Sequence, residues 1–218
     1  MKNYPLFSVR ETLLTEGEPD ALFQQCLLDA KRFIDANSVS DVLNYALERE
    51  ENRRLIRESV RSVLHVGFLS PYRDLTDLEG LSKKAGFPSC FSTPASAVVS
   101  RELGYIEGCD KIPTSIFTAK LGEISEDSSY VEVFTPDVEG ARVRKWVENE
   151  EGTHIGFTLG QPSAFGDIQN AFLSEGFQIA PFMEGKRIES PGKEASIIYY
   201  DKLYMGRKLR LEIFSPCA

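Results

Sequence analysis

Over the first 62 residues, apolar and polar positions alternate with the period of a helix. Within "EPDALFQQCLLDAKRFIDAN", apolar side chains recur at spacings of four, five and eight residues, which is typical of a helix with one buried face. "NSVSDVL" then offers Ser38 and Ser40 as N-cap residues, so a second helix is predicted from Asp41 to about Arg61. Its charged middle, "EREENRRLIRE", indicates a solvated face. Residues 1–62 are therefore predicted to form a helical N-terminal extension.

From Leu64 onward the pattern changes to short β-branched and aromatic runs separated by Gly, Pro, Ser and Asp, which favours strands. The first set of segments is "LHVGFLS", a helical "DLTDLEGLSKKAGF", "SCFSTPASAVVS", "TSIFTAKLGE" and "YVEVFTP". The second set is "THIGFTL", a helical "SAFGDIQNAFLSEGF", "FQIAPFMEGKRI", "ASIIYYDKLYM" and "LRLEIFSP". Each set predicts the order β-α-β-β-β. The sequence thus predicts an α+β fold with two βαβββ modules, module one at 63–136 and module two at 152–216.

The two modules match at both ends, which indicates an internal repeat. Each helical segment ends in Gly-Phe, and each last strand has a Glu followed by a β-branched residue, Phe, Ser or Thr, and Pro. His65 and His154 are 89 residues apart, whereas Glu132 and Glu212 are 80 apart. The difference falls inside module one, where "SRELGYIEGCDKIP" is interpreted as a longer loop.

The only two histidines of the chain occupy the same local frame, His-β-branched-Gly-Phe, at the start of each module. Because side chains alternate between the two faces of a strand, each module can direct one His and one Glu into a cavity. Two imidazoles and two carboxylates suit a divalent metal such as Zn²⁺, Ni²⁺, Co²⁺, Mn²⁺ or Fe²⁺. Taken singly, such a His is more often a core side chain and such a Glu an edge residue facing water. Their equivalent positions in a repeat favour a metal site.

The order β-α-β-β-β twice, with His opening and Glu closing each module, resembles the vicinal oxygen chelate superfamily over about residues 62–216. "GTHIGFTL" and "LRLEIFSP" are the most specific phrases. Members include glyoxalase I, methylmalonyl-CoA epimerase, extradiol dioxygenases, 4-hydroxyphenylpyruvate dioxygenase and the fosfomycin-resistance proteins. The resemblance implies that the two modules form one U-shaped open barrel around one divalent transition metal. The implied ligands are His65, Glu132, His154 and Glu212.

The resemblance leaves three functions open. Glyoxalase-like and epimerase-like members use all four ligand positions, which implies proton transfer through an enediolate on a small oxo- or hydroxy-acid-like substrate, with Glu132 or Glu212 as the catalytic base. Dioxygenases related to the 2-oxoadipate or 4-hydroxyphenylpyruvate enzymes hold Fe(II) with two His and one Glu, here His65, His154 and Glu212. The helical extension is similar to the 2-oxoadipate family, but "HVGFLSP" lacks the arginine of that family. The third hypothesis is a non-catalytic protein that binds a small molecule. The presence of Glu132 favours the first hypothesis, proton transfer.

Substrate-binding residues are expected on the same strands as the ligands. Arg210 is the best candidate for an anionic substrate group, because it lies two residues before Glu212 on the same strand face; an exposed strand residue is the alternative. Phe134 and Phe214 are expected to form an apolar wall beside the metal, with core packing as the alternative. Weaker candidates are Lys120, Tyr199 and Arg207.

Charge and cysteine usage narrow the class of protein. A net charge of −8 argues against a general nucleic-acid-binding protein, which usually carries a basic surface. The four cysteines include no Cys-x-x-Cys pair, so reduced thiols are expected. No run reaches the roughly 18 apolar residues of a membrane span, and no signal-peptide pattern opens the chain. We expect a cytoplasmic monomer or homodimer that acts on a small molecule, with no nucleic-acid or membrane partner.

Overall fold

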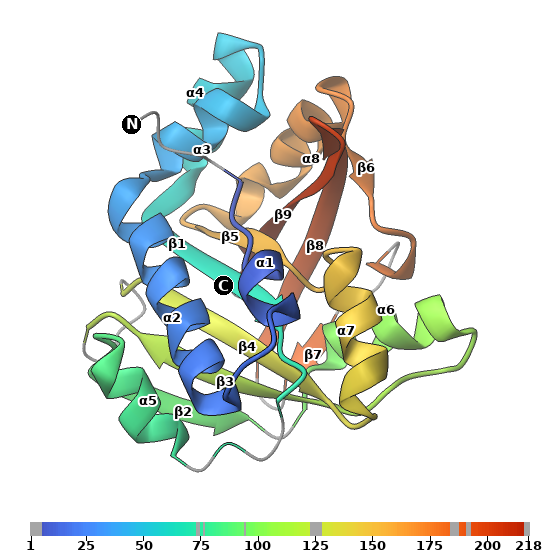
Figure 1. The fold of residues 1–218 in the computed structure, drawn as a ribbon. Helices are drawn as coiled ribbons and strands as arrows, with labels where there is room; N and C mark the ends of the chain where they lie inside the picture. Colours follow the sequence, from blue (N-terminus) through green and yellow to red (C-terminus); the bar gives the residue numbers. More distant parts are fainter. Residues whose placement is uncertain are drawn as a thin grey trace. The chain divides into compact units, whose positions relative to one another are not determined.

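The computed structural model describes residues 6–72, 75, 77–93, 95–122, 128–183, 188–190 and 193–215. The fold is mixed α+β, as predicted (Figure 1). The chain forms two compact units. The first-module unit comprises Phe7–Asp35 and His65–Thr153, and the second-module unit comprises Met1–Leu6, Ala36–Leu64 and His154–Ala218. Within the described ranges, no helix is both long enough and apolar enough to cross a membrane.

The first-module unit contains a sheet with the strand order β2-β3-β4-β1. β1 and β4 are parallel, whereas β3 is antiparallel to both β4 and β2. Its strands are β1 (Val60–Leu69, in this unit from His65), β2 (Ser89–Thr93), β3 (Thr114–Lys120) and β4 (Tyr130–Pro136). Its helices are α1 (Arg10–Leu14), α2 (Pro19–Ala36), α5 (Leu78–Lys84), α6 (Ala97–Glu107) and α7 (Gly140–Glu148).

The second-module unit repeats this arrangement with the strand order β5-β9-β8-β6. β5 and β9 are parallel, whereas β8 is antiparallel to β9, β6 and β7. Its strands are β5 (His154–Leu159), β6 (Gln178–Ile179), β7 (Ile188–Ser190), β8 (Lys193–Tyr204) and β9 (Arg207–Ser215). Its helical segments are α3 (Val39–Ala46), α4 (Glu50–Ser59), η1 (Pro162–Ala164), α8 (Phe165–Ser174) and η2 (Pro181–Met183). In both units the first strand of the module pairs in parallel with the last, so the predicted repeat is present in the strand pairing.

The segment predicted as one helix from Asp41 to Arg61 contains two helices. Ser38 is the N-cap of α3, as predicted, and forms a capping box with Asp41. Leu47 then has an extended backbone, α4 starts at Glu50, and the chain is already in β1 at Val60. The buried positions of α3 are not continued by the charged residues that follow, so a single helix would have no continuous apolar face.

The segment interpreted as a long loop in module one is also different, because most of it is helix α6. Ser96 accepts a hydrogen bond from the Val99 N–H at the start of α6, and Gly108 ends the helix with a φ of 70°. The β-branched side chains of Val98 and Val99 favour a strand, but these residues and Leu103 form the buried face of this helix. The predicted strand "SCFSTPASAVVS" therefore ends at Thr93. The predicted strand "FQIAPFMEGKRI" is also interrupted, since β6 ends at Ile179 and η2 follows it, while residues 184–187 of this prediction lie outside the described residues.

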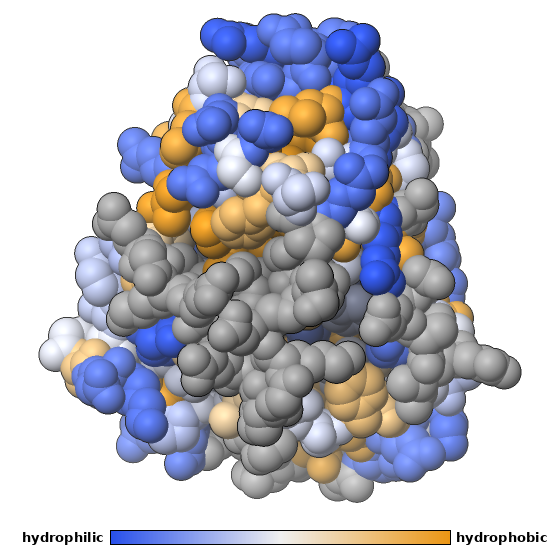
Figure 2. Space-filling model, turned by 180° about the vertical axis from the view of Figure 1, so that it is seen from behind, coloured by the Kyte–Doolittle hydropathy of each residue, from blue (hydrophilic) through white to orange (hydrophobic). Residues whose placement is uncertain are grey.

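Large apolar side chains reach the surface at scattered points. Met205, with a φ of 49°, and Gly206 form the two-residue turn between β8 and β9, and the side chains of Leu203 and Met205 are exposed there. Tyr105 is exposed on α6. Figure 2 shows apolar (orange) residues among hydrophilic (blue) ones on the back of the molecule. Single exposed apolar side chains are ordinary on a protein surface, so they mark no site by themselves.

Glu175, which directly follows α8, anchors the start of α4. Its carboxylate accepts hydrogen bonds from the backbone N–H groups of Glu48 and Arg49, at 2.8 and 3.0 Å, and from Asn52 Nδ2 at 2.7 Å. The N-cap residue of α4, Arg49, makes no capping hydrogen bond through its own side chain. Burial raises the pKa of Glu175, but these hydrogen bonds together outweigh burial and hold the pKa below its usual value.

Replacing Glu175 with glutamine is expected to lower the free energy of unfolding at pH 7 by about 2 kcal/mol, because hydrogen bonds to a buried charged acceptor are lost. The lowered pKa makes this contribution fully present above the unfolded-state value of about 4.3 and lost as the pH falls through the folded-state value. Urea unfolding at pH 7 and at pH 3 measures both effects. The matched control is Glu58→Gln on the exposed face of α4. An equal loss in both variants would contradict the anchoring role.

Candidate metal centre

In the first-module unit, strand pairing places His65 and Glu132 on one face of the sheet. β1 and β4 are parallel neighbours in which His65 lies opposite Tyr130 and Gly67 lies opposite Glu132. Because residues two apart on a strand share a face, the side chains of His65 and Glu132 project from the same side of the two strands. His65 is buried, and Glu132 is partly exposed.

The second-module unit repeats this relation with His154 and Glu212. Gly156 on β5 lies opposite Glu212 on β9, and His154 precedes Gly156 by two residues, as His65 precedes Gly67. His154 Nε2 and Glu212 Oε2 are 3.4 Å apart, and both side chains are buried. Each unit thus holds one histidine and one glutamate in the same strand register.

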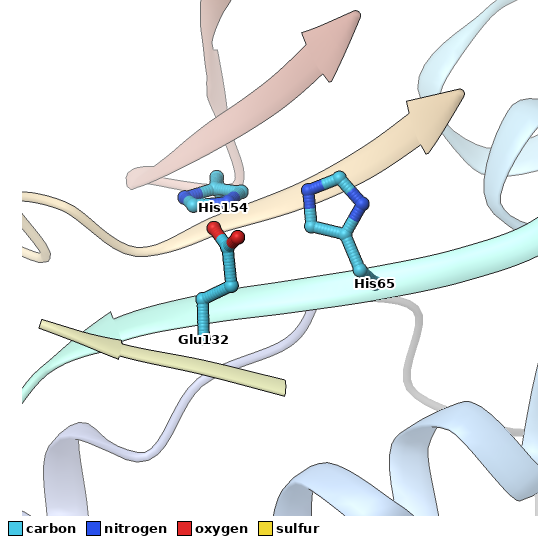
Figure 3. A group of neighbouring side chains, drawn as sticks. All are labelled: His65, Glu132 and His154. Carbon is cyan, nitrogen blue, oxygen red and sulfur yellow. The ribbon is translucent and has the colours of Figure 1, made fainter. Parts of the chain in front are cut away.

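The four predicted ligands come from both units, with His65 and Glu132 in the first-module unit and His154 and Glu212 in the second. Figure 3 labels three of them, His65 on β1, Glu132 on β4 and His154 on β5. A common metal centre formed by the two units stays a prediction.

The donor set fits a divalent transition metal. Imidazole nitrogen and carboxylate oxygen bind Zn²⁺ at about 2.0–2.2 Å, so two donors of one ion are separated by at most about 4.4 Å. In the second-module unit, the 3.4 Å between His154 Nε2 and Glu212 Oε2 lies within this limit. The mixture of nitrogen and oxygen donors suits Zn, Ni, Co, Mn or Fe(II).

Aromatic rings flank both histidines. The Tyr130 ring stacks on the His65 imidazole with a centroid distance of 4.6 Å and an interplanar angle of 5°. The Tyr199 ring lies 5.2 Å from the His154 imidazole at 42°. These contacts restrict rotation of the imidazoles and so help to hold their nitrogens in place. Tyr130 lies two residues before Glu132 on β4, so alternation places both side chains on the same face of the strand. This spacing is the sequence signal that points to Tyr130 as a neighbour of the predicted ligands.

Arg210 occupies the predicted strand face but has a partner of its own. Its Nε and Nη2 donate to the two carboxylate oxygens of Asp201, at 2.7 and 2.8 Å, across the β8–β9 pair. The guanidinium is buried and lies over the rings of Tyr199 and Phe182, with centroid distances of 5.1 and 5.5 Å. The carboxylate of Asp201 balances the charge, so an anionic substrate group would have to share Arg210 with it. A substrate-binding role of Arg210 stays a prediction.

The two predicted wall residues differ in burial. Phe134 is buried and lies two residues after Glu132 on β4, so it shares the face of that glutamate. Phe214 is partly exposed and stands in the same relation to Glu212 on β9. Both therefore lie on ligand-bearing strand faces, and their contact with a substrate stays a prediction.

Comparisons with known proteins returned structural similarity alone. No family model matches the sequence, and no curated protein matches it. A mutant of 4-hydroxymandelate synthase from Streptomyces coelicolor is 11% identical with a TM-score of 0.43, over 71% of this chain and 47% of that chain. Methylmalonyl-CoA epimerase from Mycobacterium tuberculosis is 12% identical with a TM-score of 0.41, over 73% of this chain and 91% of that chain. The chain spans about half the length of the synthase structure.

Proposed function

We propose that this protein is a divalent-metal-dependent enzyme that transfers a proton on a small oxo- or hydroxy-acid-like substrate. One observation carries the proposal: the position of Glu132 on β4 relative to His65 repeats that of Glu212 on β9 relative to His154. In the glyoxalase-like proteins that the sequence resembles, this position is a metal ligand, whereas the related dioxygenases do not use it. The placement of Glu132 therefore favours proton transfer.

The residues that would hold the ion are His65, Glu132, His154 and Glu212. A divalent ion bound there supplies Lewis-acid polarisation of a substrate carbonyl, which acidifies the neighbouring C–H group. The two imidazoles and Glu212 are buried, so their nitrogen and oxygen donors have little access to water. A catalytic metal site also keeps a position open for substrate oxygens.

Glu132 is suited to act as the catalytic base. It is the more exposed of the two glutamates, since Glu212 is buried against His154. A carboxylate has two oxygens, so one can coordinate while the other accepts a proton. Glu132 then takes the proton from the carbon beside the carbonyl, and the electron pair of the broken C–H bond moves toward that carbonyl. Return of the proton to either carbon completes an isomerisation or epimerisation without any net change in oxidation state.

A second candidate is an Fe(II)-dependent dioxygenase that uses His65, His154 and Glu212. The 3.4 Å separation between His154 Nε2 and Glu212 Oε2 favours it, because it brings that carboxylate beside an imidazole donor. Two histidines and one carboxylate leave a face open for a substrate and O₂. If the protein is such a dioxygenase, Glu132 is not a metal ligand.

The two functions are separated by incubating the metal-loaded protein with 2-oxo and 2-hydroxy acids in D₂O. Proton transfer predicts that deuterium enters the carbon next to the carbonyl, as seen by NMR, with no consumption of O₂. Consumption of O₂ in proportion to substrate loss would overturn the proposal in favour of the dioxygenase. Elemental analysis of protein purified without a histidine tag identifies the ion used.

A further inference from the structure

A cavity of about 380 Å³ lies beside the first turn of α6 in the first-module unit. It is built by the segment that makes module one longer than module two, and the predicted metal ligands do not line it. Its lining includes Ala97, Ser100 and Arg101 from α6, and Asp110 and Lys111 from the segment that follows. The volume lies within the range of about 300–1,000 Å³ that is typical of small-molecule sites.

The walls of this cavity are fixed by backbone contacts. A Cβ atom on Gly104 would meet Lys111 Cα at 2.6 Å, so α6 and the following segment pack together at a position where only glycine fits. The Ile112 N–H donates to the Ser100 carbonyl at 2.9 Å, and the Ser96 N–H donates to the Thr114 carbonyl at 2.7 Å. The cavity is therefore formed before any ligand arrives.

Arg101 gives the cavity its chemical character. Its Nε and Nη2 are buried and have no hydrogen-bond partner in the part of the chain that the structure describes. A guanidinium is always charged, and burying its donors without an acceptor is unfavourable. An oxyanion in the cavity that Arg101 lines would balance this charge. A change of the Arg101 rotamer would then let the guanidinium donate to acceptors that the described residues do not supply. Because a guanidinium matches the two oxygens of a carboxylate or phosphate, this is the ligand chemistry that Arg101 favours.

The other lining residues agree with an anionic ligand. Lys111 adds a second positive charge and Asp110 one negative charge, so these three ionisable residues carry a net positive charge. Ser96 and Ser100 are buried in the wall. We propose that this cavity binds a small organic molecule bearing a phosphate or carboxylate group, with Arg101 as the main contact. The site is independent of the proposed metal centre and of the reaction proposed for it.

The test uses two-dimensional ¹⁵N–¹H NMR spectra of the full chain, titrated with inorganic phosphate and, separately, with acetate at constant ionic strength. We expect saturable shifts of the amides of residues 96–101, 110–112 and 114, with a Kd of about 1–10 mM for at least one of the two ions. The ion that binds more tightly identifies the group that the cavity recognises. Shifts that do not saturate, or shifts centred on His65 and Glu132, would overturn the proposal.

Variants make the test specific. Arg101→Gln is expected to weaken binding about tenfold or more, because the charge-assisted hydrogen bonds are lost. The matched control is Arg54→Gln, which removes an exposed arginine from α4 and should leave binding unchanged. Ala97→Leu narrows the cavity without changing its charge and should also weaken binding, so the test stands even if Arg101→Gln folds poorly. Equal binding by wild type, Arg101→Gln and Ala97→Leu would show that the cavity is not the site.

Discussion

Replacing Glu132 with glutamine is expected to lower turnover by about 10²–10⁴-fold, because a carboxamide cannot accept the proton that leaves the substrate carbon. The amide keeps the size of the side chain and an oxygen that can still approach the metal, so metal content should fall far less than turnover. Deuterium incorporation measured by NMR, together with metal analysis of the same samples, separates the two effects.

The matched control for this variant is Glu139→Gln, which removes an exposed carboxylate just before α7 that makes no capping hydrogen bond. Turnover of the control should stay within about twofold of wild type, as expected for a surface change away from the site. Unchanged turnover in Glu132→Gln would remove this residue as the base. If O₂ consumption also persisted, the set of His65, His154 and Glu212 would become the preferred site.

Replacing either His65 or His154 with alanine is expected to weaken zinc binding by about two orders of magnitude or more, since removal of even an outer-shell partner typically costs 10–100-fold. The two imidazoles occupy equivalent positions in the two modules and both are buried, so each loss should have a similar effect. Competition with a chromogenic chelator measures the affinity, and circular dichroism checks that the fold remains.

The control for the histidine variants is Cys109→Ser, because Cys109 is an exposed thiol that can bind zinc adventitiously. This variant should keep the affinity of the wild type. Zinc binding that survives in His65→Ala but is lost in Cys109→Ser would place the ion away from the predicted centre.

The repeated strands could be predicted because their pattern is local. "LHVGFLS" and "THIGFTL" carry a period of two, and the matching phrases around Glu132 and Glu212 identify the last strand of each module. Once the first and last strands of a module pair in parallel, the register that brings each His near its Glu follows from alternation. The pairing itself is a tertiary property, which the sequence pattern did not predict.

The features that the sequence did not indicate depend on contacts between distant residues. β-branched residues are common in strands, so Val98 and Val99 suggested a strand where tertiary packing favours helix α6. The sequence places Arg210 on the face of Glu212, but only the pairing of β8 with β9 brings Asp201 opposite it as a partner. The capping of α4 by Glu175 joins residues more than 120 positions apart, and no local pattern signals it.

If the two His–Glu pairs hold one metal ion between them, native mass spectrometry of the untagged protein with added Co²⁺ will detect one ion per chain in the wild type. We expect no bound ion in either His65→Ala or His154→Ala at the same Co²⁺ concentration. Two ions per wild-type chain, or one ion retained in either variant, would contradict a single shared centre.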